Sequence, residues 1–400
     1  MFHKISVKNL NIEAGLNKIL VEPDLPFSKI AIDFLDELSI SIFKNKKLKF
    51  HPELASYAFW SRKSNLLNLK KRVKSNELKI GKGFIFHLPP SNVPINCIYS
   101  FSLGLLFGNS NIIKVPSKDF IIVKLILIEI KKIMNAKKFR KIKVKNCFVR
   151  YDSQIKEITQ KISEISNVRM IWGGNDKVQD IKKIQSNHSC IDIPFYDKYS
   201  FSVINMEVFK KLRDLEFKKL VDKFYSDAFF MDQNACGSPH LIFWIGTRNK
   251  KKINKFWNFL YEIIQKKYNY ENISTIDKLV KYNEDLIDNK NIKNINNFGN
   301  ILYVANLVRI PKDISKQRGR WGYFYQFNFN KLNKLKLFIN NNTQTMSYFG
   351  FDRGILENFI KKNNLTGIDR IVPIGKAHDI DIIWDGYDLS NLLTRTIKIE

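Results

Sequence analysis

The chain has 400 residues, 44% of them hydrophobic and 26% charged, which is enough for two substantial domains with separate cores. The net charge is +29, but the lysines are spread along the chain among Asn and Ile. This spread favours solvated helix faces, with weak attraction to acidic partners, over a nucleic-acid-binding arm. No stretch reads as a membrane span and no signal peptide is recognisable, so we expect a cytoplasmic protein with reduced cysteines. No Cys/His spacing suggests a metal site.

The first half of the chain predicts a parallel, doubly wound sheet. Residues 1–80 combine a short apolar-alternating segment with two helical stretches. Strands and helices then alternate, and ligands of such sheets bind beyond the carboxyl ends of the strands. The predicted strands are 83–88, 111–115, 147–150 and 168–172, and the predicted helices are 95–107, 120–134, 152–165 and 176–185.

A second alternation of strands and helices begins further along the chain. Residues 192–204 read as loop and strand, and residues 206–224 as a helix. After a short loop come a strand at 241–245 and a helix at 252–267. The Asn-, Lys- and Asp-rich residues 270–300 predict a solvated helix or loop, followed by short strands at 301–304, 307–310 and 323–329 and a glycine-punctuated tail.

Cys236 lies in the short loop before the 241–245 strand. Its neighbours Ala235, Gly237, Ser238 and Pro239 are small or turn-forming, whereas a structural cysteine is usually flanked by bulky apolar residues. This setting leaves the sulfur open to approach, and a thiolate both attacks carbonyls and leaves again. The residue is therefore a candidate nucleophile, with a packed, inert cysteine as the alternative.

Three further features follow predicted strands. Asn92, in the Pro89–Pro94 turn, is either a turn former or an oxyanion donor. Gly173 and Gly174 form either a plain turn or an approach for a phosphate at the next helix N-terminus. Lys114 is either a solvated lysine or a ligand for ribose or phosphate.

Together these segments resemble the aldehyde dehydrogenase signature, a P-x-N-x-P turn, a helix and then G-N-x-x-x-x-K-P-S. The matching residues are Pro89–Pro94 and Gly104–Ser117, with an extra Val115. The segments Asp232–Pro239, Asp369–Gly375 and Trp384–Gly386 narrow the resemblance to the LuxC-type acyl-CoA (long-chain fatty-acyl) reductases. The resemblance runs from about residue 80 to the end, whereas the first 80 residues resemble no family.

The resemblance implies an aldehyde-dehydrogenase-like α/β fold, with a doubly wound nucleotide-binding domain and an α/β catalytic domain. The domains expected on this basis are an N-terminal segment at 1–80 that packs on the first domain, an NADP-binding domain at 81–225, a catalytic domain at 226–350 and a tail at 351–400. The tail would either serve oligomerisation or return to the first domain. A homo-oligomer is expected.

The resemblance also implies roles for individual residues. Cys236 would be the acylated nucleophile, and Asn92 would hold the oxyanion together with the backbone N–H of Cys236. Lys114 and Ser117 would face the adenosine ribose, and Gly173 and Gly174 the cofactor phosphates or nicotinamide side. The absence of an acid directly after Lys114 suits NADPH, whose 2′-phosphate Ser117 and Lys118 would accept.

One departure from the aldehyde dehydrogenase pattern bears on the reaction. Aligning Lys198 with the lysine of an E-L-G-G-K motif places Pro194 where a water-activating Glu would stand. Without that base an acyl-enzyme survives until hydride reaches it, which favours a reductase.

The predicted activity is NADPH-dependent reduction of an acyl thioester to the aldehyde. The acyl donor would be acyl-CoA, an acyl carrier protein or an acyl-protein synthetase. The alternatives are an inactive aldehyde-dehydrogenase-like binding protein and a basic nucleic-acid-binding protein. His240 and His378 would either orient the thiol or a proton, or serve as ordinary core or surface residues.

Overall fold

A computed structural model describes residues 2–4, 10–73, 77–90, 93–269 and 272–400. The chain forms two compact units. The first unit comprises Met1–Asp197 and Ile380–Glu400, and the second comprises Lys198–Asp379. These bounds differ from the predicted domain limits at 198–225 and at 351–379, which belong to the second unit, whereas residues 380–400 of the predicted tail belong to the first.

The first unit is built on a six-stranded sheet with the order β2-β7-β6-β5-β8-β9. All neighbouring pairs are parallel except β2 with β7, which confirms the predicted doubly wound sheet. The strands are β2 (Asn11–Gly15), β5 (Phe84–Leu88), β6 (Ser110–Lys114), β7 (Asn146–Arg150), β8 (Val168–Trp172) and β9 (Ile191–Phe195).

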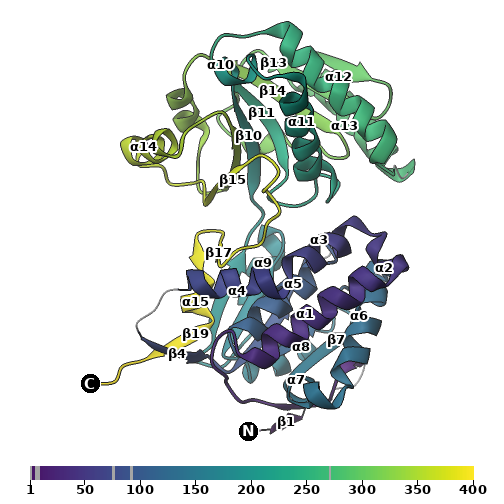
Figure 1. Cartoon of the computed structure of the whole chain (residues 1–400), viewed down its shortest axis with the longest axis vertical. Coiled ribbons are helices and arrows are strands. Elements are labelled where there is room, and N and C mark those ends of the chain that lie inside the picture. The colour runs from purple at the N-terminus through teal and green to yellow at the C-terminus, as the bar shows by residue number, and fades with distance from the viewer. Residues whose placement is uncertain (1, 5–9, 74–76, 91–92, 270–271) are drawn as a thin grey trace. The chain divides into compact units, whose positions relative to one another are not determined.

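Helices cover both faces of this sheet (Figure 1). On one face, α8 (Lys156–Glu164) and α9 (Asn175–Lys182) pack their apolar sides against β5, β6 and β8. On the other, α5 (Asn96–Leu106) is buried along almost its whole length, because α1 (Lys29–Lys44) lies outside it and contributes Phe34 against Phe101. The other helices of this unit are α2 (Lys46–Lys49), α3 (Pro52–Trp60), α4 (Lys63–Arg72), α6 (Ile121–Met134), α7 (Arg140–Lys145) and the short α15 (Leu389–Leu392).

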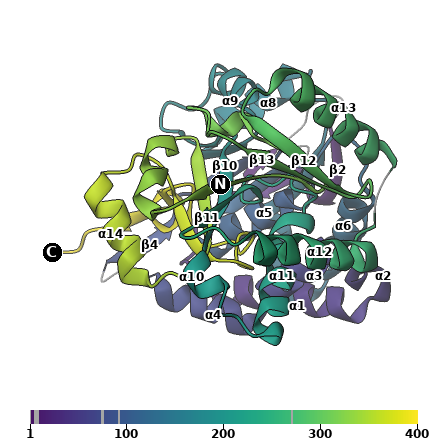
Figure 2. The same cartoon turned by 90° about the horizontal axis from the view of Figure 1, so that it is seen from above.

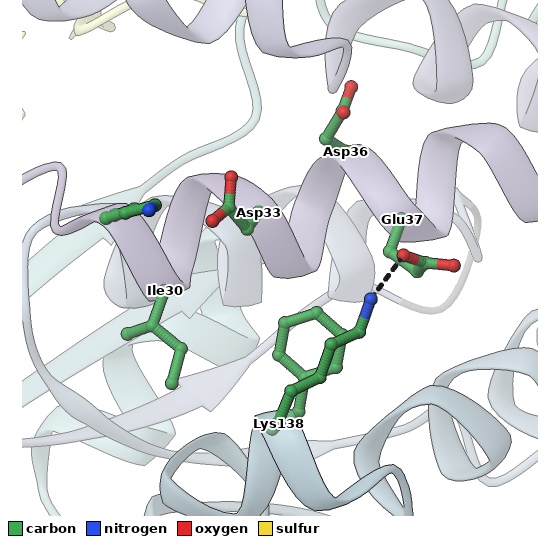
Figure 3. A pocket seen from close by; sticks show the side chains of 7 residues that line it. Ile30, Asp33, Asp36, Glu37 and Lys138 are labelled. Atoms are coloured by element: carbon green, nitrogen blue, oxygen red, sulfur yellow. Dashed lines mark hydrogen bonds and ion pairs between the residues drawn. The ribbon is translucent and has the colours of Figure 1, made fainter.

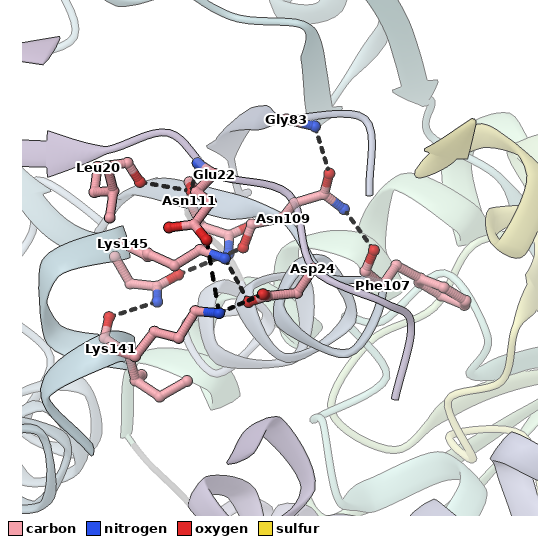
Figure 4. Close-up of polar contacts among 12 residues, drawn as sticks. Leu20, Glu22, Asp24, Gly83, Phe107, Asn109, Asn111, Lys141 and Lys145 are labelled. Carbon is pink, nitrogen blue, oxygen red and sulfur yellow. Dashed lines mark hydrogen bonds and ion pairs between the residues drawn. The ribbon is translucent and has the colours of Figure 1, made fainter. Parts of the chain in front are cut away.

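Asn109 ties together the chain where β5 and β6 begin (Figure 4). Its side-chain oxygen accepts the N–H of Gly83 at 3.0 Å, and its amide donates to the carbonyl of Leu393 at 2.9 Å. Close by, the carboxylate of Asp24 accepts bonds from Lys141 at 2.6 Å and Lys145 at 2.5 Å. The Gly-Asn part of the signature is therefore structural, since it lies at the strand ends opposite those where ligands bind.

The end of the chain completes the first unit. Strand β19 (Thr394–Ile397) pairs antiparallel with β4 (Leu78–Gly81). The indole N–H of Trp60 donates to the carbonyl of Ile380 at 2.9 Å, and Arg72 forms an ion pair with Asp381 at 2.6 Å. Residues 380–400 are thus held by strand pairing and by side chains from the first 110 residues.

The second unit holds a seven-stranded sheet with the order β12-β13-β14-β11-β10-β15-β16, parallel except for β12. Along β10 and β11 alternate side chains enter the two apolar clusters on opposite faces, as the two-residue period of a strand requires. The strands are β10 (Tyr199–Asn205), β11 (Pro239–Ile245), β12 (Ile292–Phe298), β13 (Leu302–Leu307), β14 (Tyr323–Phe329), β15 (Thr343–Phe349) and β16 (Arg370–Pro373).

Figure 2 shows α11 and α12 on one side of this sheet and α13 on the other. Helices α11 (Asp214–Phe229) and α12 (Lys250–Lys267) supply one cluster, and α13 (Asn272–Asp288) and α14 (Arg353–Asn363) contribute to the other. Among the described residues no helix is long and apolar enough to cross a membrane.

Several elements of the second unit differ from the prediction. The 206–224 helix is two helices, α10 (Met206–Phe209) and α11, and the expected 307–310 strand ends at Leu307 as part of β13. Strand β15, which lies between β10 and β16, was not predicted. Its first residues, Thr343–Ser347, are mostly polar yet buried, so they lack the apolar pattern by which strands are recognised.

Candidate active site

The segment that carries Cys236 joins α11 to β11 through a strained backbone. Asp232 and Gln233 have φ angles of +51° and +56°, in the left-handed region that non-glycine residues seldom adopt. The buried Gln233 side chain holds this shape by accepting the N–H of Gly322 at 2.8 Å and donating to the carbonyls of Pro239 and Tyr323 at 3.2 and 3.3 Å. The loop is therefore fixed from within the unit.

Cys236 differs from the two cysteines of the first-unit core. Cys97 and Cys147 are buried, and burial raises the pKa of each thiol to about 12. Cys236 is only partly buried, and its carbonyl accepts the hydroxyl of Ser200 at 2.5 Å. The Ser200 oxygen in turn accepts the N–H of Thr345 at 3.1 Å, so two neighbouring strands position the cysteine backbone.

A second loop, residues 374–379, packs against the cysteine segment. A methyl group on Gly237 would lie 2.8 Å from the carbonyl oxygen of Ala377. The Nε2 of His378 lies 3.4 Å from the hydroxyl of Ser238 and 2.8 Å from the carbonyl of Asp227, to which it donates. The residues directly after Cys236 are therefore in contact with this loop.

The two histidines that the sequence singled out are neutral and packed. Burial lowers the pKa of His240 to about 3, and its ring stacks on Tyr199 while Nδ1–H donates to the carbonyl of Gly319. Burial likewise lowers the pKa of His378 to about 4. His240 is a core histidine, and His378 serves to connect two backbone segments.

A cationic pocket of about 350 Å³ adjoins the cysteine segment through Trp321, whose N–H donates to the carbonyl of Asp232 at 3.3 Å. Lys278, Lys281, Arg318 and Arg320 line it, together with Asp277 and Glu284. Burial lowers the pKa of Lys278 to about 7, and its ammonium donates to the carbonyl of Trp321 at 3.2 Å. Sequence reasoning missed this pocket, because its lysines look like all the others.

In the first unit, Lys114 is the last residue of β6, and Ser117 lies beside it in the following loop. The Lys114 ammonium donates to the hydroxyls of Ser117 at 3.2 Å and Ser153 at 3.0 Å, and it lies 4.9 Å from the centre of the Tyr151 ring. Burial, aided by the charge of Lys177, lowers the pKa of Lys114 to about 8. These side chains are bonded to one another, and form one polar group at the carboxyl end of the strand.

Gly173 and Gly174 join β8 to the N-terminus of α9. Gly173 has a φ of +157°, and a methyl group there would lie 2.9 Å from the side chain of Lys177. Around Gly174 no atom lies within 4 Å of such a methyl group, so a ligand can approach this backbone. Lys177 also donates to the carbonyl of Pro89 at 3.0 Å, and it is a cation that the sequence did not single out. Asn92 lies outside the described residues.

Residues 49–288 match the acyl-CoA reductase (LuxC) family. The chain belongs to this family. The matched range contains Cys236, Lys114, Ser117 and both glycines, and it begins within the first 80 residues, where the sequence had shown no resemblance. The family assignment confirms the predicted resemblance and makes the chain an acyl reductase-type oxidoreductase. A comparison with curated proteins finds no match.

Solved structures place this LuxC-family chain in the aldehyde dehydrogenase fold, as predicted. An NAD-dependent benzaldehyde dehydrogenase from Corynebacterium glutamicum shares 11% identity at a TM-score of 0.62, over 94% of this chain and 86% of that one. A lactaldehyde dehydrogenase shares 12% at 0.62, over 92% and 85%. The Thermus thermophilus 1-pyrroline-5-carboxylate dehydrogenase shares 11% at 0.63, over 92% and 80%.

Another hollow of the LuxC-family chain, of about 450 Å³, lies along α1 (Figure 3). Two of its three carboxylates pair with exposed lysines, Glu37 with Lys138 at 2.8 Å and Asp33 with Lys63 at 2.9 Å, and Asp36 accepts the backbone N–H of Lys63 at 2.8 Å. Across the described part of the chain no group of three or more His, Cys, Asp and Glu side chains could hold a metal ion. We regard this hollow as a solvated charged face.

Proposed function

We propose that this LuxC-family protein reduces an acyl thioester to the aldehyde with NADPH, through an acyl-enzyme on Cys236. The observation that carries the proposal is the cysteine itself. It is a partly exposed thiol on a fixed loop that two strands and a neighbouring loop hold, whereas Cys97 and Cys147 are buried with raised pKa values. A nucleophile requires both exposure and a fixed position.

The chemistry at Cys236 divides the reduction into acyl transfer and hydride addition. The thiolate attacks the thioester carbonyl, and the donor thiol leaves as a thiolate that takes up a proton. Bound NADPH supplies the hydride that adds to the acyl carbon. Hydride addition leaves the alkoxide of a Cys236 hemithioacetal, and its collapse breaks the C–S bond and releases the aldehyde together with the Cys236 thiolate. Over the cycle, one acyl thioester, one NADPH and one proton yield aldehyde, free thiol and NADP⁺.

Charge develops on the acyl oxygen in both steps. The backbone N–H of Cys236 and the side-chain amide of Asn92 are the proposed donors to this oxygen, and both are carried over from the resemblance. A donor aimed at a developing oxyanion stabilises the transition state by about 3–4 kcal/mol. Pro194, a residue of β9, brings no carboxylate to activate water, which supports reduction of the acyl-enzyme over its hydrolysis.

The first unit offers groups that suit a dinucleotide. Lys114 and Ser117 present an ammonium and a hydroxyl at the carboxyl end of β6, where ribose hydroxyls or a 2′-phosphate would bind. Gly174 leaves open backbone at the N-terminus of α9, where a phosphate is favoured by the helix dipole. Lys177 adds a positive charge beside this turn.

The cationic pocket beside the cysteine segment suits a phosphorylated substrate as well. Both CoA and a nicotinamide nucleotide carry phosphates, and guanidinium groups such as those of Arg318 and Arg320 bind phosphate oxygens in pairs. Replacing Arg320 with Ala should raise the KM of one of these two substrates, which identifies the ligand. An acyl carrier or an acyl-protein synthetase remains the alternative donor to acyl-CoA.

The test is NADPH oxidation with acyl-CoA substrates of several chain lengths, for wild type, Cys236→Ala and Cys190→Ala. Cys190 is the matched control because it is also only partly buried. The alanine variant at 236 should lose turnover and should fail to retain a radiolabelled acyl group in the absence of NADPH, whereas Cys190→Ala should keep both. Turnover retained by Cys236→Ala would exclude the assigned nucleophile.

A further inference from the structure

A buried carboxylate on α11 holds the 374–379 loop by its backbone. The side chain of Asp227 is 1% exposed. Its Oδ2 accepts the N–H of Gly375 at 2.7 Å, and its Oδ1 accepts the N–H of Ala377 at 3.0 Å. Each oxygen takes a different N–H group, so both must be acceptors for the loop to be held at both places.

Arg370, at the start of β16, holds the same loop by its carbonyl groups. Its guanidinium donates to the carbonyl of Ala377 at 3.0 Å and to that of Asp379 at 2.8 Å, with a longer contact to Lys376 at 3.4 Å. The carboxylate therefore takes the N–H groups of the loop and the guanidinium takes the carbonyls. Such charge-assisted bonds are stronger than neutral ones and fix the position of the loop.

The held loop is in contact with the residues that follow Cys236. The carbonyl of Ala377 faces Gly237 so closely that a methyl group there would lie at 2.8 Å. His378 bridges the carbonyl of Asp227 and the hydroxyl of Ser238. Movement of the 374–379 loop must therefore move the backbone on the carboxyl side of Cys236, because close-packed contacts transmit displacement.

We propose that Asp227 is a positioning residue for Cys236, which fixes the thiol through the 374–379 loop and does so fully only as the ionised carboxylate. This inference rests on the proposed function, in which Cys236 is the nucleophile. Asp227 itself touches no reacting atom. Asp227 affects the position of the sulfur relative to the acyl carbon. A displacement of about 1 Å between reacting atoms lowers the rate on the order of a hundredfold.

Asp227 changes its protonation state near neutral pH. Burial raises the pKa of this carboxyl to about 7, against the two backbone N–H groups that lower it. Asp379 raises the pKa further and Arg370 lowers it. Other charged or titratable groups near this site are Lys223, Lys376 and His378. The side chain of Lys223, on α11, packs on Gly375. Lys376 pairs with Asp379 at 2.7 Å, and His378 is neutral.

Protonation of Asp227 weakens the hydrogen bonds that this carboxylate accepts from the loop. A protonated carboxyl carries one O–H group, and that oxygen no longer accepts an N–H as a carboxylate oxygen does. The contact to Gly375 or to Ala377 is then weakened, and the loop loosens. Catalysis should accordingly rise as pH increases through about 7.

The experiment compares Asp227→Asn and Asp222→Asn with the otherwise wild-type protein, and all three carry Cys190→Ala. Asp222 is an exposed residue of the same helix, paired with Lys267 at 2.5 Å. We expect Asp227→Asn to lower kcat by about tenfold or more at a pH of about 8, with the KM for the acyl donor within about twofold. It should also lose the rise of kcat near neutral pH, which wild type and Asp222→Asn keep.

A second readout does not depend on turnover. The rate at which iodoacetamide alkylates Cys236 should rise with pH in two steps in wild type, one from the thiol and one from Asp227, and in a single step in Asp227→Asn. Cys236→Ala supplies the blank. Because alkylation needs neither acyl donor nor NADPH, it tests the positioning role even if the proposed reaction is wrong, and turnover by Cys236→Ala tests the reaction alone.

A third variant covers the case in which Asp227→Asn fails to fold. Gly237→Ala should lower kcat by pushing the cysteine segment away from Ala377, while keeping the rise near neutral pH, because the carboxylate is intact. The proposal is overturned if Asp227→Asn keeps the wild-type kcat and pH profile. It is equally overturned if wild-type alkylation shows only the thiol step.

Discussion

The two candidate sites of this chain are built in opposite ways. In the first unit, side chains and open backbone gather at the carboxyl ends of parallel strands, and Gly174 has no atom within 4 Å of an added methyl group. In the second, a strained loop is held on several sides, and a methyl group on Gly237 would lie 2.8 Å from a backbone oxygen. The first arrangement leaves room for a ligand, and the second fixes the backbone around the candidate nucleophile.

This difference separates binding from chemistry. Substitutions at the strand ends of the first unit should change the affinity for a cofactor and leave the fold intact. Substitutions in and around the cysteine segment should change kcat, stability or both, since its backbone depends on buried contacts.

The largest effect is expected at the thiol. Cys236→Ser should lower kcat by at least about a thousandfold, because a hydroxyl without an activating base is a poor nucleophile. Binding of NADPH, followed by the quenching of tryptophan fluorescence, should stay within about twofold of wild type. A serine variant with near wild-type kcat would remove the contrast between the sites.

The next effect is expected at the buried amide under the cysteine loop. Gln233→Ala removes three hydrogen bonds and leaves the N–H of Gly322 without its acceptor. The free energy of unfolding, measured in urea, should fall by about 3 kcal/mol. Gln265→Ala, which removes an exposed bond to Tyr261, is the control and should change stability by less than about 0.5 kcal/mol.

The buried carboxylate should give stability a specific pH dependence. The pKa of Asp227 is about 7 in the folded protein and about 3.9 in an unfolded chain. Between these values the folded state binds a proton that the unfolded state lacks, so this group's contribution declines as pH rises. The stability of wild type minus that of Asp227→Asn should fall by about 4 kcal/mol across this window. The buried His87 and His240 titrate in both proteins and cancel; a flat difference would contradict the assignment.

A smaller effect is expected at the first-unit strand end. Lys114→Ala should raise the KM for NADPH by about tenfold with kcat nearly unchanged, because a charge-assisted bond to phosphate or ribose is lost. Lys124→Ala, an exposed lysine of α6, is the matched control. An equal rise for both variants would mean that only the general positive charge matters.

The smallest effect compares the two glycines. Gly174→Ala should change the free energy of unfolding by less than about 0.5 kcal/mol, since its space is open and its φ is ordinary. Gly237→Ala should destabilise the fold measurably more, because the Ala377 carbonyl must move. Thermal melts of the two variants would show whether the second site is indeed the more tightly held.

The sequence predicted what is local. The fold class followed from the alternation of strands and helices, and Cys236 stood out because small residues surround it. The signature motif also pointed to Lys114 and Ser117, which lie together in the structure. The motif did not reveal that Asn109 has a structural role, because the hydrogen bonds of Asn109 to Gly83 and Leu393 join segments that are distant in the sequence.

What the sequence did not reveal depends on tertiary contacts. Asp227 is an ordinary helical aspartate until the 374–379 loop, about 150 residues later, places two N–H groups against it. Lys278 and Lys177 are indistinguishable from other lysines until burial lowers their pKa values. Strand β15 was hidden because its buried residues are polar.

The return of residues 380–400 to the first unit has a consequence for synthesis on the ribosome. The partner strand of β4, the Leu393 carbonyl that binds Asn109 and the Ile380 carbonyl that binds Trp60 emerge only after the whole second unit has been made. During that interval the nascent first unit carries an unpaired strand edge, and the indole N–H of Trp60 lacks its Ile380 acceptor. Such edges favour association with other chains, so we expect this protein's folding yield in cells to depend on how quickly translation reaches residues 380–400.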